Sequence, residues 1–186
     1  MKIQSISILI LLLVLPMFSY SQSKQFTREG HIQFLSVAEA ENIEANNYKV
    51  TSIIDFATGK MEFAVLMKAF EFEKALMEEH FNENYVESEL FPKSTFKGAI
   101  TNLDEVNLEA DGEYSVNVEG ALTIHGVTKD ITAPATITVA EGVVSGTTSF
   151  TVKVADYDIS IPKVVIKNIA EEITVNVNCK YQELKK

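Results

Sequence analysis

This sequence has very little cysteine, and its proline, glycine and serine residues do not gather into any one segment. The only cysteine, Cys179, has no second cysteine with which to form an internal disulfide. The fold must therefore be held together by packing. Because no Pro-, Gly- or Ser-rich linker and no internal repeat divides the chain, we expect a single domain, which suits a chain of this length.

Basic residues are also scarce. The chain carries 16 Lys and Arg against 26 Asp and Glu, a formal net charge of −10. Nucleic acids and anionic membrane surfaces both attract clustered Lys and Arg. The charge balance therefore argues against either as a partner, and its simplest role is to keep the protein soluble.

A long apolar run occurs only at the N-terminus. Lys2 precedes the run Ile3–Leu15, and the small residues Ser19 and Ser21 follow it with the spacing of a signal-peptidase site. These features are typical of a secretory signal peptide. We expect residues 1–21 to be cleaved and the domain to comprise residues 22–186.

The same run is a poor membrane anchor. A spanning helix needs about 20 consecutive apolar residues, and polar residues interrupt this run at Gln4, Ser5 and Ser7. No cysteine lies near the cleavage site to carry a lipid. The mature protein is therefore expected to be exported without a stable membrane anchor.

Signatures of catalysis are absent from the sequence. His31 lies in an expected strand, His80 at the end of an expected helix and His125 in an expected turn, so no two share a metal-ligand spacing. We expect His80 to stabilise the helix C-terminus, His125 to form a hydrogen bond within its turn, and Cys179 to behave as a small buried hydrophobe. The sequence predicts no enzyme, no catalytic residue, no metal site and no cofactor.

The dominant pattern is the alternation of apolar and polar residues, which is typical of strands with one buried face. The clearest case places Tyr114, Val116, Val118, Leu122 and Ile124 on one face. Turn signals such as Asp111-Gly112 and Glu141-Gly142 separate the alternating segments. About eight strands are predicted, near residues 30–37, 49–56, 60–68, 94–101, 114–125, 131–139, 144–154 and 173–181.

One segment breaks the alternation. From Phe72 to Tyr85 the apolar residues recur every three to five positions, and glutamates fill the other side. This spacing predicts a short amphipathic helix. Antiparallel strands with one covering helix fit a sandwich or a closed barrel, and periodicity does not choose between them.

Three segments carry a more specific signal. They are Asp55–Phe63, the stretch from Leu76 to Gly98 with its His80-Phe81 pair, and Glu119–Lys129, which includes Leu-Thr-Ile-His-Gly-Val-Thr-Lys. In this order they resemble the YceI-like family of lipocalin-like barrels that bind polyisoprenoid lipids. The resemblance implies an all-β fold, an antiparallel eight-stranded lipocalin-like β-barrel with one short amphipathic helix. It also implies a periplasmic location, with full secretion as the alternative.

The expected inward faces leave two options for the barrel interior. Eight strands enclose a space that side chains can fill or that can hold one small ligand. Gly98, Gly120, Ala133, Ala135 and Gly146 are small residues at inward positions, which leaves room. Alternatively, the glycines mark close backbone approaches, and larger side chains such as Tyr114 fill the space. The family resemblance favours a ligand.

The residues expected to line a ligand cavity are apolar and lie on the inward strand faces and the helix. They are Phe63, Val65, Met67, Phe72, Leu76, Met77, Phe81, Tyr114, Val116, Val118, Leu122, Phe150 and Val152.

Two functions follow as hypotheses. The first is an exported lipid-binding protein that carries or sequesters a long apolar chain, an isoprenoid lipid or an isoprenoid quinone, in its interior. The alternative is a protein-interaction or stress-response module with a filled barrel and an acidic contact surface on the helix and the following loop. The oligomeric state is left open, with a homodimer as one option.

Overall fold

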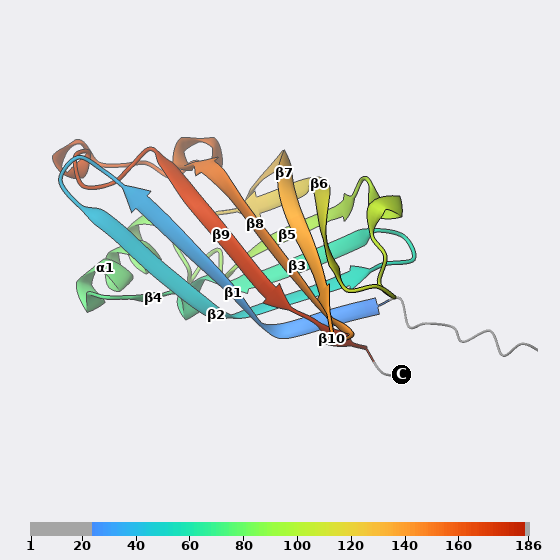
Figure 1. Ribbon diagram of the computed structural model, residues 1–186. Coiled ribbons are helices and arrows are strands. Elements are labelled where there is room, and N and C mark those ends of the chain that lie inside the picture. Colours follow the sequence, from blue (N-terminus) through green and yellow to red (C-terminus); the bar gives the residue numbers. More distant parts are fainter. Residues whose placement is uncertain (1–23, 185–186) are drawn as a thin grey trace, which may run out of the picture.

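The computed structural model of the chain describes residues 24–184, and its core is a closed antiparallel barrel (Figure 1). Eight strands follow one another around the wall in the order β1-β9-β8-β7-β6-β5-β3-β2, and the pairing of β1 with β2 closes the circle. The predicted lipocalin-like barrel is confirmed. The predicted signal peptide lies outside the described residues.

The eight wall strands coincide with the eight alternating segments, although the first two are longer than expected. Their bounds are β1 Lys24–Val37, β2 Asn42–Asp55, β3 Lys60–Leu66, β5 Lys93–Ile100, β6 Gly112–Ile124, β7 Val127–Ala140, β8 Val143–Lys153 and β9 Glu172–Lys180. Two short strands, β4 Glu71–Phe72 and β10 Gln182–Glu183, extend β2 and β1. Short helical turns, η1 Met67–Ala69, η3 Leu103–Glu105, η4 Val154–Tyr157 and η5 Lys163–Val165, lie in the connections.

The helix is shorter than its periodicity predicts. Helix α1 spans Ala75–His80 and continues as a π-helical turn, η2, over Phe81–Tyr85. Phe72, the expected first residue, instead pairs with Ala45 of β2 in strand β4. The backbone groups of β2 are free to pair at that point, so the chain adds a strand before it turns into the helix. Within residues 24–184, no helix is long and apolar enough to cross a membrane.

The strand connections divide the barrel into two ends. Because the strands are antiparallel, the β1–β2 turn, the helical segment between β3 and β5, the β6–β7 turn and the long segment 154–171 share one end, which lies to the left in Figure 1. We call this the helical end. The β2–β3 turn, the β5–β6 connection, the β7–β8 turn and β10 lie at the other end, which we call the strand end.

Gly98 and Gly120 face each other across the β5–β6 ladder. A Cβ atom on Gly120 would lie 2.5 Å from Cα of Gly98 and 2.8 Å from Cζ of Phe96, closer than van der Waals contact allows. The two strands therefore approach at a point that only glycine permits, and the Phe96 ring lies over it. These two glycines mark a close backbone approach and add no empty volume.

The barrel wall has a seam between β7 and β8. Their ladder runs from Ala140↔Val143 to Ala135↔Thr148, and Figure 1 shows the strands diverging beyond it. Pro134, the next residue of β7, has no N–H to donate. Turn η4, which follows β8, lies near both strands farther toward the helical end, and its Tyr157 is buried. Hydrogen bonds between β7 and β8 therefore hold only the part of the wall nearer the strand end.

Candidate functional site

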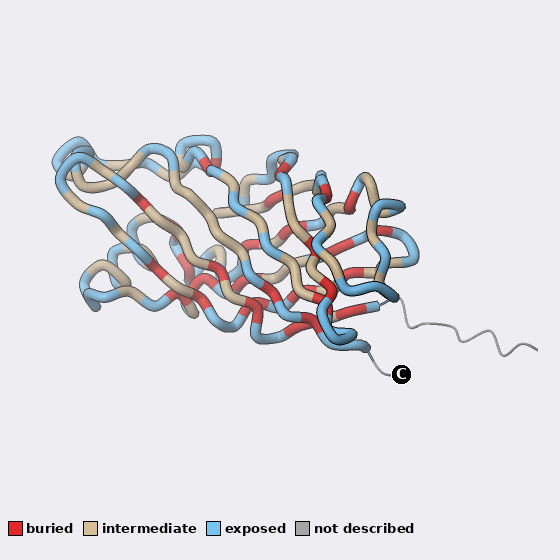
Figure 2. The backbone as a smooth tube through the Cα atoms, viewed as in Figure 1, coloured by how far each residue is buried: buried red, intermediate tan, exposed pale blue. Residues whose placement is uncertain are grey.

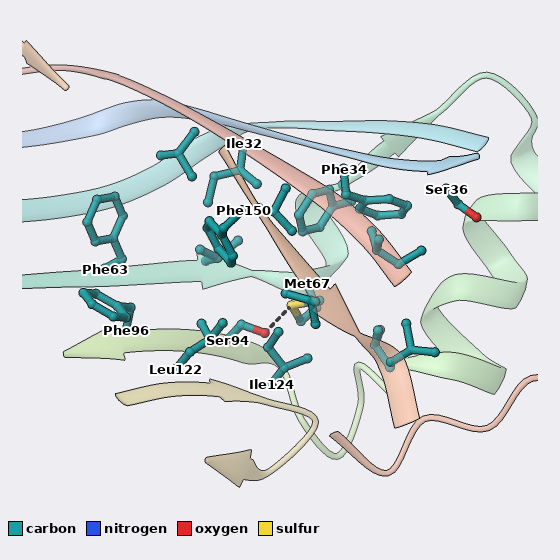
Figure 3. A pocket seen from close by; sticks show the side chains of 18 of the residues that line it. Ile32, Phe34, Ser36, Phe63, Met67, Ser94, Phe96, Leu122, Ile124 and Phe150 are labelled. Carbon is teal, nitrogen blue, oxygen red and sulfur yellow. Dashed lines mark hydrogen bonds between the residues drawn. The ribbon is translucent and has the colours of Figure 1, made fainter. Parts of the chain in front are cut away.

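The barrel interior is hollow from the helical end as far as Met61, Gly146 and Tyr181. A cavity of about 450 Å³ runs through it, lined almost entirely by apolar side chains, and its volume falls within the usual range of ligand pockets. Figure 3 shows lining side chains of several strands pointing into one space. Ser94, a polar residue of the lining, donates its hydroxyl to Sδ of Met67 at 3.1 Å, so this hydroxyl already has a partner.

Burial along β9 indicates that the space is not filled. Ile173, Val175 and Val177 point inward and line the cavity, yet they are only half-buried. Figure 2 shows the same intermediate burial along much of β9. Apolar residues that face a filled interior make contacts on all sides and lose nearly all their exposure. Their partial exposure therefore marks a space that solvent-sized molecules can reach.

Three of the five small inward residues contribute to this space. Ala133, Ala135 and Gly146 line the cavity, and a Cβ on Gly146 would only touch Ile137 and Tyr181, each at 3.5 Å. Gly98 and Gly120 do not line it. Ala133, Ala135 and Gly146 therefore leave room in the interior, as one interpretation predicts, whereas Gly98 and Gly120 mark a close backbone approach, as the other predicts.

Ten of the thirteen residues expected to line a cavity surround this one. They are Phe63, Val65, Met67, Phe72, Met77, Phe81, Val118, Leu122, Phe150 and Val152. Whether a ligand contacts them stays a prediction.

The other three expected residues lie elsewhere. Leu76 is 60% exposed, because Met77 and Phe81 occupy the inward side of the helical segment. Val116 is 2% exposed within the packed core of the strand end. Tyr114 packs against that core and donates its hydroxyl to the carbonyl of Ala110 at 3.0 Å. The cavity ends before it reaches these two residues.

Sequence reasoning missed the lining from the first strand and from segment 154–171. Ile32 and Phe34 of β1, and Ile159, Ile161 and Ile169 of the long connection, all line the cavity. Ile32 and Phe34 lie in an expected strand, so the alternation of apolar and polar residues could have identified them as inward-facing. The isoleucines of the connection follow no regular period, although their density in a loop is itself unusual.

A group of aromatic rings covers the cavity at the helical end. The Phe81 ring lies 5.1–5.6 Å from those of Phe34, Phe70 and Phe72, in tilted or edge-on arrangements. Such geometries are favourable for aromatic pairs. The helical segment is thus anchored by its apolar face, as the amphipathic pattern predicts.

Polar contacts tie the elements around the cavity mouth together. Glu41, in the β1–β2 turn, accepts hydrogen bonds from Nζ of Lys74 at 2.7 Å and from Nδ2 of Asn168 at 3.4 Å. The hydrogen bond from Lys74 lowers the pKa of Glu41, and the bond from Asn168 adds to this. Ser36 accepts a further bond from the backbone N–H of Ala170.

The three histidines lie apart and have separate partners. The imidazole of His31 stacks on Tyr48 with ring centroids 4.5 Å apart, and His80 is exposed at the cavity mouth. His125 bonds across elements, so the expected bond within its own turn is wrong. Its Nδ1 lies 3.0 Å from the Tyr157 carbonyl oxygen and its Nε2 lies 2.7 Å from Oε2 of Glu87.

Cys179 packs in the core of the strand end, in line with the predicted role of a small hydrophobe. Burial raises the pKa of its thiol to about 11, so it remains protonated and unreactive near neutral pH. Among residues 24–184, no group of three or more His, Cys, Asp or Glu side chains is placed to hold a metal ion.

The family described as the YceI-like domain matches residues 18–181 of the chain. The chain belongs to the YceI-like family. The resemblance carried by the three sequence segments is thereby confirmed. A search among curated proteins finds no match.

Solved structures with the same fold differ widely in sequence from this YceI-like chain. One is a polyisoprenoid-binding domain from Saccharophagus degradans implicated in plant cell wall breakdown, with 12% identity, a TM-score of 0.76, and coverage of 88% of this chain and 100% of that one. Burkholderia cenocepacia BcnA has 16% identity, a TM-score of 0.66, and coverage of 82% and 96%. The Campylobacter jejuni YceI protein has 16% identity, a TM-score of 0.55, and coverage of 100% and 92%.

Proposed function

We propose that this YceI-like protein is exported, and that it holds a long apolar chain, an isoprenoid lipid or an isoprenoid quinone, inside its barrel. The observation that carries the proposal is the apolar cavity of about 450 Å³ surrounded by half-buried inward residues. Each buried methylene contributes about 0.8 kcal/mol, so a long hydrocarbon chain binds there without many polar contacts.

Two further observations support this function. A structural neighbour is described as a polyisoprenoid-binding domain, and the chain belongs to the same family of barrels. The cavity also disfavours the alternative of an interaction module, since that hypothesis assumes a filled interior. Binding requires no reacting group, which agrees with the predicted absence of enzyme activity.

The test is to fill the cavity at one position. Ala135 of β7 lines it, and Thr136, the next residue, faces outside. Ala135→Phe should lower binding of geranylgeraniol by about tenfold or more, because the new ring occupies the space of several methylenes. Thr136→Phe adds the same ring to the outer face of the same strand and should leave binding unchanged.

The measurements are displacement of the neutral dye Nile red and mass spectrometry of lipids extracted from protein purified from its native compartment. Circular dichroism checks that both variants fold. Full geranylgeraniol binding by a folded Ala135→Phe protein would overturn the proposal. So would the absence of both an extractable apolar ligand and any Nile red binding in the wild type.

A further inference from the structure

The lining of the cavity contains a carboxylate but, within residues 24–184, no lysine or arginine. Among the described residues, Glu41 is its single acidic one; Ser36, His80 and Asn168 lie toward the mouth, and uncharged Ser94, Thr95, Thr147 and Thr148 lie along the wall. A phosphate or carboxylate that entered would lose water without meeting a permanent cation. Such desolvation is unfavourable unless a paired charge compensates for it.

Glu41 remains ionised at the mouth. Its carboxylate is paired with Lys74 at 2.7 Å, and Asn168 donates a second hydrogen bond. The ammonium of Lys74 is already engaged with Glu41. An anionic group at the mouth would have to compete with Glu41 for Lys74.

The whole helical end is strongly acidic. The four connections at this end, residues 38–41, 67–92, 125–126 and 154–171, contain twelve Asp and Glu and four Lys, a formal charge of −8 out of −10 for the entire chain. Outside these segments the charges nearly cancel. Because clustered charges of one sign create potentials of several kT at a surface, the field at the cavity mouth repels anions.

We propose that the cavity selects long apolar molecules whose polar end is uncharged, such as an alcohol or a quinone, and excludes the same chains when they end in phosphate or carboxylate. This inference rests on the proposed lipid-binding function and specifies its ligand class. The apolar lining recognises the chain, and the acidic helical end discriminates between head groups.

The test compares two ligands with the same hydrocarbon chain, geranylgeraniol and geranylgeranyl phosphate, as competitors of Nile red. In low salt the alcohol should displace the dye at about tenfold lower concentration, since a potential of a few kT corresponds to a factor of about ten. Near 1 M salt, where the Debye length is about 3 Å, the difference should shrink.

Charge reversal at the helical end tests whether its acidic residues cause the weaker binding of the phosphate. Glu73, Glu79 and Glu83 are exposed and do not line the cavity. The triple variant E73K/E79K/E83K should strengthen binding of the phosphate several-fold and leave binding of the alcohol unchanged. The control E109K/E113K/E141K makes the same charge change at exposed positions of the strand end and should preserve the wild-type difference.

The two proposals fail in different ways. Equal displacement by the alcohol and the phosphate in the wild type, or an equal effect of the two triple variants, would overturn the head-group inference alone. Failure of both ligands and of Nile red to bind would overturn the lipid-binding function, and the inference with it.

Discussion

The two ends of this barrel are stabilised in different ways. At the strand end, buried side chains that include Ile100, Val116 and Cys179 pack together between the strands, and the inner part of the cavity borders on this core. At the helical end, inward residues of β9 face an open cavity, hydrogen bonds of Glu41 and His125 connect the elements, and Glu41 also forms an ion pair with Lys74. At the helical end a second packed cluster, which includes Met67, Phe70 and Val86, borders the cavity, so the two ends differ in how far packing fills the interior.

The largest expected difference between the two ends concerns loss of apolar volume. Ile100 is buried in the packed core, whereas Ile173 lines the cavity. Ile100→Ala should lower the free energy of unfolding by about 2–5 kcal/mol, since it leaves a void among close neighbours. Ile173→Ala should lower it by about 1 kcal/mol, because part of that side chain faces empty space. Urea denaturation measures both, and equal losses would contradict the division into two ends.

A smaller difference is expected when one methyl group is added. Gly120→Ala would place its Cβ against the backbone of β5 and should destabilise the fold by about 1–3 kcal/mol. At Gly146 the new methyl meets only ordinary contacts beside the cavity, and the loss of chain entropy in the unfolded state should stabilise the protein by about 0.4–1 kcal/mol.

Thermal unfolding of Gly120→Ala and Gly146→Ala gives the comparison directly. A stabilised Gly120→Ala protein would mean that β5 and β6 do not approach as closely as their glycines indicate. A strongly destabilised Gly146→Ala protein would mean that no free space exists beside that residue.

The smallest expected effect tests whether water is excluded from the Cys179 thiol at the strand end. Burial raises the pKa of the Cys179 thiol from 9.0 to about 11. Above about pH 9 the unfolded chain loses this proton and the folded protein keeps it, so the unfolded state is favoured as pH rises. The free energy of unfolding should fall by about 1 kcal/mol between about pH 8 and about pH 10 from this group.

The matched variant is Cys179→Ala, whose stability should depend less steeply on pH over the same range. Urea denaturation at several pH values measures the slope. Identical slopes in the two proteins would show that the thiol is not desolvated. Tyr181 also has its pKa raised, mainly by burial and in smaller part by Cys179, so the variant keeps the part due to burial and loses the part due to the thiol.

Much of the architecture could be predicted from local pattern. The alternation of Tyr114 through Ile124 fixes which face of β6 is apolar, and the turn at Glu141-Gly142 has the positive φ angles of a two-residue hairpin. These features depend on near neighbours in the chain. The closure of the barrel depends on β1 meeting β2 and β9, and only the family resemblance indicated it.

The cavity could be predicted only in part. Which apolar residues point inward follows from alternation, but where packing stops depends on the positions of several strands at once. Val116 and Val118 share one face of β6, yet the first is packed and the second lines the cavity. The partners of Glu41 and His125 come from distant segments, so no local spacing reveals them.

The seam between β7 and β8 affects what determines the circumference of the barrel. In a fully hydrogen-bonded cylinder, the number and stagger of the strands set the circumference. Within the described chain, no backbone hydrogen bond joins β7 to β8 between Pro134 and the helical end. There the two strands are connected through η4, which lies near both of them, and through His125, whose Nδ1 lies 3.0 Å from the Tyr157 carbonyl oxygen of that turn. The two strands can therefore separate along this line at the helical end without breaking any hydrogen bond of the β7–β8 ladder.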